Sequence, residues 1–515
     1  MSEHQGERGP RRGGASGQHH RGRDGVRRNA QGRERNRGAG DGGRQFSSAA
    51  PSQRSRRADP ARLTAFEVLR AVSGADAYAN LVLPGLIREH RLGRRDAAFA
   101  TELAYGTLRA QGSYDAILAE CVDRPLKALD PAVLDVLRLG THQLLGMRVA
   151  THAALDETVG LTRAVIGAGP SGLVNAVLRK VSVRSLDEWL AELTDRNPDA
   201  IEQLALRFAH PSWVVRALRQ ALVGHGREVG EIEDLLTADN EAPVVNLVTL
   251  PGLGSAEDLA DSGAEEGPLV RDSWLSSGGD LSRIEAVRRG TVRVQDVGSQ
   301  LVARALAAAE TTGVDGGAER WLDLCAGPGG KAALLGALAA QEGASLLANE
   351  AQEHRAELVR KALSAVPGDG WSVRTGDGRA VGEELPGHFD RVLVDVPCSG
   401  LGALRRRPEA RWRRTPGDVA ELGPLQRQLL DSALDATRSG GVVAYVTCSP
   451  HLAETRTVVD DVLRKRSDVE ALEAGTVLDS VALPDTLAAG HGHYAQLWPH
   501  LHGTDAMFLA LLRKK

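Results

Sequence analysis

Apolar residues recur every three or four positions along the part of the chain that follows residue 57, which is the spacing of amphipathic helices. Asp59 and Pro60 form a typical helix start, a capping side chain followed by a proline at the first helical position. Further apolar stripes cover 79–90, 95–120, 129–145 and 152–167. Because no convincing strand pattern occurs before about residue 240, we expect residues 58–185 to form an all-helical domain of some six helices.

The pattern changes from about residue 320, where short apolar runs alternate with segments of helix length. The runs, each bounded by Gly, Pro or Asp, are Trp321–Cys325, Ser345–Ala348, Val392–Val396 and Val442–Val446, with Met507–Leu512 as a last strand. This alternation predicts a parallel, doubly wound sheet with helices on both faces, within a domain over 291–515. Residues 186–290 combine a strand pattern at Val244–Val248 with a Gly/Ser/Asp-rich stretch, so a small α/β connector is expected there.

Length and composition agree with a protein of several globular domains. The 515 residues fit two to four domains, and 42% hydrophobic with 25% charged residues exclude collagen-like, coiled-coil and fully disordered chains. No apolar stretch reaches the roughly 20 residues that span a bilayer, and an apolar signal core is missing at the N-terminus, so a cytoplasmic protein without membrane attachment is expected. The four cysteines include no C-x-x-C pair; free thiols and no metal site are expected.

Charge is distributed unevenly along the chain. Residues 1–57 hold fourteen Arg, no Lys and five acidic residues, a net of +9, so the formal −4 of the whole chain leaves −13 for residues 58–515. The first segment is rich in Gly with Phe46 as its only aromatic residue, so it cannot bury enough apolar surface to fold and is expected to be a disordered basic tail. Contact with RNA phosphates is the favoured role, and a solubilising extension is the alternative.

A glycine-rich segment stands where the first strand of the sheet should end and a helix begin. The residues expected to contact a cofactor there are Cys325, Ala326, Gly327, Pro328, Gly329, Gly330 and Lys331. Glycines let the backbone approach a ligand at the carboxyl edge of such a sheet. The segment is not a phosphate-binding Walker A loop, because Ala332 follows Lys331 where a magnesium-binding Ser or Thr would stand.

Two acidic residues extend this cofactor site. Glu350 ends the second strand, twenty residues after Gly330, where a carboxylate can accept hydrogen bonds from both hydroxyls of a ribose. An adenosine-containing cofactor is therefore expected. Asp377 follows the third strand and is placed to receive the adenine amino group, with a solvated loop residue as the alternative interpretation.

Two cysteines follow two later strands. Cys398 lies in Asp395-Val396-Pro397-Cys398-Ser399-Gly400, and Cys448 lies in Thr447-Cys448-Ser449-Pro450. The carboxyl ends of parallel strands meet at one edge of a sheet, so two thiols and the carboxylate of Asp395 should converge beside the cofactor loop. An isolated buried cysteine is usually inert, but strand-end loops commonly carry function.

These motifs together resemble the Sun/Fmu (RsmB-type) family of S-adenosylmethionine-dependent RNA cytosine-5 methyltransferases. The resemblance extends over 58–515, and its further matches are Val294–Asp296, Arg405–Glu409, Asp505–Phe508 and, in the helical block, Asn175–Arg179. It implies an all-α NusB-like N-terminal domain and a C-terminal α/β Rossmann-like class I methyltransferase domain with a mostly parallel seven-stranded sheet. Glu350, where the family usually has Asp, and the Arg/Gly tail depart from the pattern.

The resemblance also implies roles for single residues. S-adenosylmethionine is the implied methyl donor, Cys448 the nucleophile that adds to C6 of cytosine, and Cys398 the residue that assists release of the methylated base. C5 of cytosine is a poor nucleophile until a thiolate adds to C6, which explains the need for such chemistry. Asp395, beside the cofactor, is expected to hold the base at N3 and its exocyclic amine. A helix start near Ala453 could lower the pKa of Cys448.

Basic residues beyond Cys398 are expected to contact RNA, with Trp412 as a stacking surface. They are Arg405, Arg406, Arg407, Arg411, Arg413 and Arg414. Small-subunit rRNA is the favoured substrate, with tRNA as the runner-up, and a monomer is expected. A non-catalytic RNA-binding assembly or antitermination factor is the alternative from another class, but such a protein would not need both cysteines and the cofactor loop.

Overall fold

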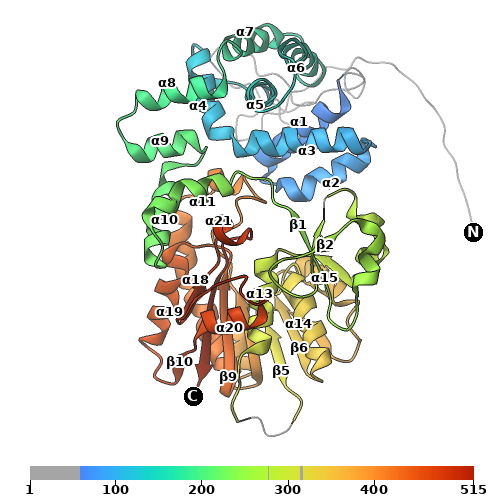
Figure 1. Cartoon of the computed structure of the whole chain (residues 1–515), viewed down its shortest axis with the longest axis vertical. Coiled ribbons are helices and arrows are strands. Elements are labelled where there is room, and N and C mark those ends of the chain that lie inside the picture. Colours follow the sequence, from blue (N-terminus) through green and yellow to red (C-terminus); the bar gives the residue numbers. More distant parts are fainter. Residues whose placement is uncertain (1–57, 277, 314–316) are drawn as a thin grey trace, which may run out of the picture. The chain divides into compact units, whose positions relative to one another are not determined.

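Seven α-helices form the first domain of the computed structural model, which describes residues 58–276, 278–313 and 317–515 (Figure 1). The helices are α1 (Pro60–Ala75), α2 (Ala79–Glu89), α3 (Arg94–Arg109), α4 (Gln111–Cys121), α5 (Pro131–Leu145), α6 (Thr151–Val165) and α7 (Ser171–Val181). The predicted tail lies outside the described residues. Asp59 caps α1 through the backbone N–H of Arg62, which confirms the predicted helix start. There is one helix more than expected, because the stripe over 95–120 is divided at Ala110 into α3 and α4.

The apolar faces of these helices meet in a core of their own. Leu103, Ile117 and Leu137 are fully buried in it, and burial of each such side chain contributes roughly 1.5–3 kcal/mol. Trp189 of α8 (Leu186–Asp195) also packs against this core. The helical block is therefore continuous with the first helix after residue 185.

The connector combines helices with a small antiparallel sheet. After α8 come α9 (Ala200–Arg207), α10 (Ser212–Gly224), α11 (Ile232–Ala238) and, later, α12 (Glu285–Arg289). The sheet has the order β2-β3-β1-β4, with β1 (Val245–Thr249), β2 (Glu265–Glu266), β3 (Ser273–Ser276) and β4 (Val292–Val294). The strand expected at Val244–Val248 is confirmed by β1. Because β4 pairs with β1, the connector's sheet extends past the expected boundary at residue 290. The sequence did not indicate this strand, since three residues are too few to show an alternating pattern.

The C-terminal domain is built on a sheet of mostly parallel strands. Its order is β10-β12-β9-β8-β5-β6-β7, and β11 pairs with β12. The strands are β5 (Arg320–Asp323), β6 (Ser345–Glu350), β7 (Trp371–Thr375), β8 (Phe389–Asp395), β9 (Thr437–Thr447), β10 (Val469–Ala471), β11 (Tyr494–Gln496) and β12 (Phe508–Lys514). The five strands from β7 to β9 are parallel, whereas β10, β11 and β12 pair antiparallel. The predicted Rossmann-like architecture is confirmed, with eight strands in place of the seven expected, because the short β11 also pairs with β12.

Helices cover both faces of this sheet (Figure 1). One face packs against α13 (Val297–Ala308), α14 (Gly330–Gln341), α15 (Glu353–Leu363) and α20 (Ala474–Val481). The other packs against α16 (Val381–Glu384), α18 (Pro416–Ala436) and α19 (Arg456–Leu463). Successive residues of β5, Trp321 and Leu322, point to opposite cores, so the strand is apolar on both sides, as parallel strands are. Within the described chain, no helix has the length and apolar character needed to cross a membrane.

Candidate active site

The order of the strands fixes where a ligand can bind. From β5 the chain continues outward to β6 and β7, whereas β8 and β9 lie on the other side of β5. Loops leave the neighbouring strands β5 and β8 in opposite directions at such a point, which opens a crevice at their carboxyl ends. The loop Cys325–Lys331 follows β5, and Asp395 ends β8. The predicted cofactor loop therefore lies at the crevice.

Glycines in this loop meet their surroundings too closely for a side chain. Gly329 has φ +104° and precedes α14, and a Cβ there would collide with Ala362. A Cβ at Gly327 would collide with the carboxylate of Glu350. The Gly327 N–H instead donates to Glu350 Oε2 at 3.1 Å, and the Gln352 N–H donates to Oε1 at 3.0 Å. Glu350 is thus held at the end of β6, and each carboxylate oxygen can accept one hydrogen bond more.

Asp323 is a buried carboxylate at the same edge that the sequence analysis missed. It ends β5 and is 1% exposed, and neither carboxylate oxygen accepts a hydrogen bond from a described residue. Burial, with repulsion from Asp395, raises its pKa to about 7, although the charge of Lys331 opposes this. A buried carboxylate without donors is costly, so a ligand with a cationic group fits this position. The available sequence signal was an acidic residue inside an otherwise apolar strand.

Asp377 occupies a more exposed position. It caps a short 3₁₀ helix, η6 (Gly378–Ala380), after β7, and its carboxylate pairs with Arg379 at 2.6 Å. This pair lowers the pKa of Asp377. The arrangement is that of a solvated loop residue, and the adenine contact stays a prediction.

The two cysteine loops meet. The distance between Cys398 Sγ and Cys448 Sγ is 3.4 Å, and the Gly402 N–H donates to the Cys448 carbonyl at 2.9 Å. A hydrogen bond between the thiols lowers the pKa of Cys448 and raises that of Cys398 well above the usual range, where burial adds to the increase. The shared proton therefore stays on Cys398, and Cys448 is the thiol of the pair that ionises more readily.

An ion pair lies against the two thiols. Lys331 Nζ contacts Asp395 Oδ2 at 2.7 Å, and both side chains are mostly buried. Burial alone would lower the pKa of Lys331, but the pairing with Asp395 outweighs it, and the pKa is raised. After the thiol contact, burial and the charge of Asp395 raise the pKa of Cys448, whereas the charge of Lys331 helps to lower it. Near Ala453 the chain forms a three-residue 3₁₀ turn, η7 (Leu452–Glu454), and the helix α19 begins after it at Arg456, slightly later than expected.

Cys325 differs from the other two thiols. Burial and the neighbouring carboxylates of Asp323, Asp395 and Glu350 raise its pKa well above the ordinary value. It is therefore a poor nucleophile, and its place in the loop agrees with a packing role at the cofactor site.

The arginines predicted to contact RNA are mostly engaged within the protein. Arg411 is fully buried and donates to Asn240 Oδ1 and to the carbonyls of Ala209 and Asp239, so the expected phosphate contact of Arg411 is wrong. Arg405 is also buried and donates to the Gly503 carbonyl.

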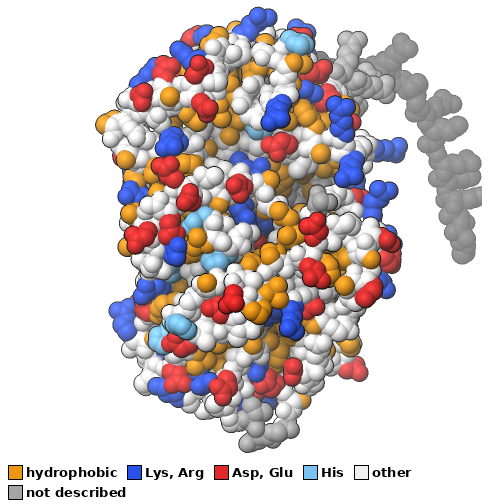
Figure 2. All heavy atoms as spheres, in the orientation of Figure 1, with side chains coloured by type: hydrophobic (Ala, Val, Ile, Leu, Met, Phe, Trp, Pro, Cys, Tyr) orange, Lys and Arg blue, Asp and Glu red, His pale blue; other side chains and the backbone are white. Residues whose placement is uncertain are grey.

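The remaining residues of this segment hold domains together in the same way. Arg413 donates to three carbonyls of the helical domain, those of Val72, Asp76 and Ala77, and the Trp412 ring lies directly against Gly112 of α4. Arg407 stacks on Tyr78. Arg406 pairs with Asp505 yet keeps 38% of its side chain exposed, and Arg414 is also partly exposed, so these two are open to contact with RNA. On the face shown in Figure 2, acidic and basic side chains are interspersed.

Replacing Arg411 is expected to affect stability rather than RNA binding. Arg411→Met should lower the free energy of unfolding by about 3 kcal/mol or more, because it leaves the buried acceptors Asn240 Oδ1 and the carbonyls of Ala209 and Asp239 without their donor. Urea unfolding measures this, and Arg414→Met, in the same segment and partly exposed, is the matched control. If Arg411→Met had native stability and bound RNA more weakly, Arg411 would contact RNA after all.

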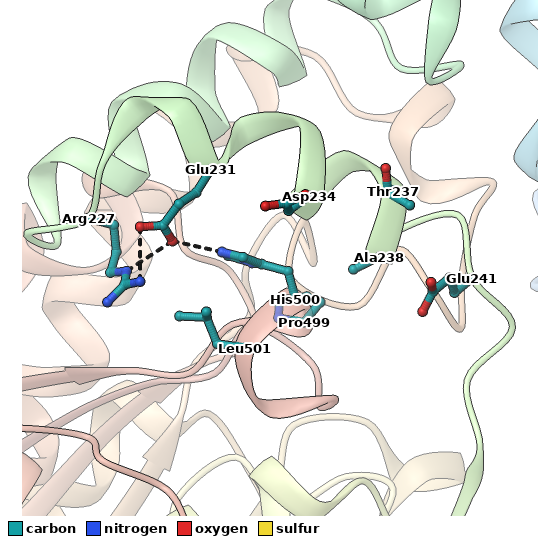
Figure 3. Close-up of a pocket in the computed structure, with 9 residues that line it drawn as sticks. All are labelled: Arg227, Glu231, Asp234, Thr237, Ala238, Glu241, Pro499, His500 and Leu501. Carbon is teal, nitrogen blue, oxygen red and sulfur yellow. Dashed lines mark hydrogen bonds and ion pairs between the residues drawn. The ribbon is translucent and has the colours of Figure 1, made fainter.

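A separate pocket contains none of the predicted site residues (Figure 3). Glu231 accepts hydrogen bonds there from Arg227 and, at 2.9 Å, from His500 of the short helix α21 (Pro499–His502). These side chains bond one another, so the pocket joins the connector to α21. Among the described residues, no group of three or more His, Cys, Asp or Glu side chains could hold a metal ion.

The fold and the crevice define the class of the protein: a Rossmann-like methyltransferase domain joined to a NusB domain. Residues 315–513 match the family model described as 16S rRNA methyltransferase RsmB/F, and residues 59–183 match that of the NusB family. The chain belongs to the RsmB/F family of 16S rRNA methyltransferases.

Individual relatives agree with this membership over nearly their full length. A putative methyltransferase of Mycobacterium tuberculosis is 50% identical over 465 residues, which cover 90% of this chain and 98% of the relative. Ribosomal RNA small subunit methyltransferase B of Escherichia coli O6:K15:H31 is 31% identical over 77% of this chain and 88% of its own. The crystal structure of PH0851 superposes with a TM-score of 0.73 at 21% identity, covering 88% of this chain and 99% of that chain, which supports the fold.

Proposed function

We propose that this chain transfers a methyl group from S-adenosylmethionine to C5 of a cytosine in small-subunit rRNA. The observation that carries the proposal is the 3.4 Å approach of Cys398 Sγ to Cys448 Sγ beside the ion pair of Lys331 and Asp395. A relative named for small-subunit rRNA methylation favours this substrate over tRNA. The two adjacent cysteines also argue against a factor that only binds RNA. Methylation of rRNA would place the enzyme in the cytoplasm.

The crevice has groups that suit S-adenosylmethionine. Glu350 would accept hydrogen bonds from the ribose hydroxyls, and Asp323 would pair with the ammonium of the methionine part. The N-terminus of α14 after Gly329 favours a carboxylate, because its backbone N–H groups lack partners within the helix. When bound, this cofactor supplies a methyl carbon made electrophilic by a sulfonium.

Cys448 acts first in the proposed reaction. Its thiolate forms a bond with C6 of the cytosine. The electron pair of the C5–C6 double bond shifts toward C5 and, through C4, toward N3, which makes C5 nucleophilic. Asp395 would hold the exocyclic amine and N3, so that the ring can accept these electrons. Lys331 fixes the Asp395 carboxylate through the 2.7 Å contact.

Cys398 acts in the second half. Once the Cys448 sulfur is bonded to C6 it no longer carries charge, so the main cause of the raised pKa of Cys398 disappears. Cys398 then loses its proton to solvent and takes the proton from C5. The electrons of that C–H bond restore the double bond, and the S–C6 bond breaks to return the pair to Cys448.

Bisulfite sequencing of total RNA with and without the gene tests the proposal directly. A single 16S rRNA cytosine that resists conversion only when the gene is present is the expected result. A gene-dependent protected cytosine in tRNA would instead identify tRNA, the alternative substrate, as the target. No gene-dependent protection in any RNA would refute cytosine-5 methylation.

Glu350 provides a test of the cofactor position. Glu350→Ala should weaken S-adenosylmethionine binding by about 1.5–3 kcal/mol, the cost of losing a charged hydrogen-bond partner. Titration calorimetry measures the affinity, and Glu357→Ala, an exposed carboxylate on α15, is the matched control. Equal affinities of the two variants would remove Glu350 from the cofactor site.

A further inference from the structure

One buried carboxylate touches both cysteine loops. Glu454 is fully buried in η7 and is not part of the reaction described above. Its Oε1 accepts from the Ser399 N–H at 2.7 Å, and its Oε2 accepts from the hydroxyls of Ser399 at 2.5 Å and Ser449 at 2.7 Å. These serines directly follow Cys398 and Cys448 in the chain.

Two further contacts hold Glu454 itself in place. Gln426 Nε2 of α18 donates to Oε1 at 3.3 Å and to the Pro397 carbonyl at 2.9 Å, while the Tyr445 hydroxyl donates to the Glu454 backbone carbonyl at 2.7 Å. An ionised carboxylate only accepts hydrogen bonds, and inside a protein it is costly unless donors surround it. All four donors to its oxygens come from the two loops and the helix beside them. Separating the loops would remove the two donors of Ser399 from this buried carboxylate.

We propose that Glu454 is a positioning residue that holds the Cys398 and Cys448 loops at the separation needed for reaction. The proposal rests on the proposed function, in which the two thiols act in turn on one base. The two serine hydroxyls also lie 3.1 Å apart, so the loops contact each other at the serines as well as at the thiols. Glu454 touches no reacting atom and acts through its neighbours.

The charge of Glu454 agrees with this role. The negative charge of Glu454 is one of the causes that raise the pKa of Cys398, with a smaller effect than the contact with Cys448 and burial. It is not among the main causes that shift the pKa of Cys448. The same carboxylate that fixes the loops therefore favours a protonated Cys398 beside an ionised Cys448.

Cross-linking of the two thiols measures their positioning without any RNA or methyl donor. Dibromobimane, a short bifunctional thiol reagent, should link Cys398 to Cys448 rapidly in the native protein and at least about tenfold more slowly in Glu454→Ala. Glu454→Gln, which keeps one carbonyl oxygen, should give an intermediate rate. Glu421→Ala, an exposed carboxylate on α18, is the matched control.

Methylation kinetics should follow the same order. We expect Glu454→Ala to lower kcat by roughly 100-fold, the effect of a misplacement of about 1 Å, with KM for RNA and for S-adenosylmethionine changed less than twofold. Glu454→Gln should restore most of the loss. A role in folding alone would instead lower the fraction of folded protein, seen in thermal melting, and would leave kcat per folded enzyme at the native value.

The outcomes separate the two proposals. Native cross-linking and native kcat in folded Glu454→Ala would overturn the positioning role. If that variant does not fold, the double variant Ser399→Ala/Ser449→Ala, which removes two donors and keeps the carboxylate, decides in the same assays. If the native protein methylates no cytosine, the proposed function fails, while the cross-linking rates still show whether Glu454 holds the loops.

Discussion

Cys448→Ala is expected to abolish methylation of rRNA, with a loss on the order of 10⁴–10⁶-fold, the scale seen when a nucleophile is removed. The neighbouring thiol does not replace it, because burial and the charges of Glu454 and Asp395 still raise the pKa of Cys398 when Cys448 is absent. Transfer of labelled methyl groups from S-adenosylmethionine to rRNA measures the loss. Denaturing electrophoresis should show no protein bonded to RNA, since no S–C6 bond can form.

The control for this variant is another buried thiol. Cys121 lies in the core of the helical domain, so Cys121→Ala should keep native activity. A mechanism in which the Pro-Cys thiol attacks the base predicts the opposite behaviour. Accumulation of an RNA adduct in Cys448→Ala would show that Cys398 is the nucleophile, even though the class of enzyme would stand.

Sequence patterns were sufficient for the parts of the site that follow from the topology of the sheet. A parallel sheet brings the carboxyl ends of its strands to one edge, so residues just after β5, β6, β8 and β9 had to meet there. Cys398 and Cys448 lie 50 residues apart in the chain, and the 3.4 Å between their sulfurs is the expected convergence.

Side-chain partners could not be predicted in this way. A lysine in a glycine-rich loop gives no local sign that it will pair with Asp395, 64 residues later. Glu454 looks like an ordinary acidic residue of a loop, and its role depends on donors from three other segments. Such partners are set by packing between distant elements, which local periodicity does not report.

The arginine-rich segment is a second case in which the partners of side chains could not be predicted from the sequence. A run of guanidinium groups beside the active site is typical of a phosphate-binding surface. In the fold, this segment contacts backbone carbonyls of the helical domain and of the connector. Arg411 and Arg413 satisfy them, so the positive charges serve domain contacts that the sequence alone cannot distinguish from RNA contacts.

Cys398→Ala should stop the reaction at a later stage than Cys448→Ala. Cys448 can still attack C6, although more slowly because the hydrogen bond that lowers its pKa is lost, and the methyl group can still be transferred, because neither step needs the second thiol to accept a proton. Removal of the C5 proton then lacks its base, so the S–C6 bond cannot break. The variant should accumulate protein covalently bonded to methylated RNA, in an amount close to one RNA per enzyme.

Denaturing electrophoresis with labelled methyl groups reads out this state, since the label should migrate with the protein and move to free RNA after proteinase treatment. The double variant Cys398→Ala/Cys448→Ala separates the covalent adduct from tight binding, because it has no thiol that can add to C6. Its lane should contain no adduct. If Cys398→Ala instead turns over at the native rate, another group removes the C5 proton, and ionisation of Cys448 does not need the 3.4 Å approach of the thiols.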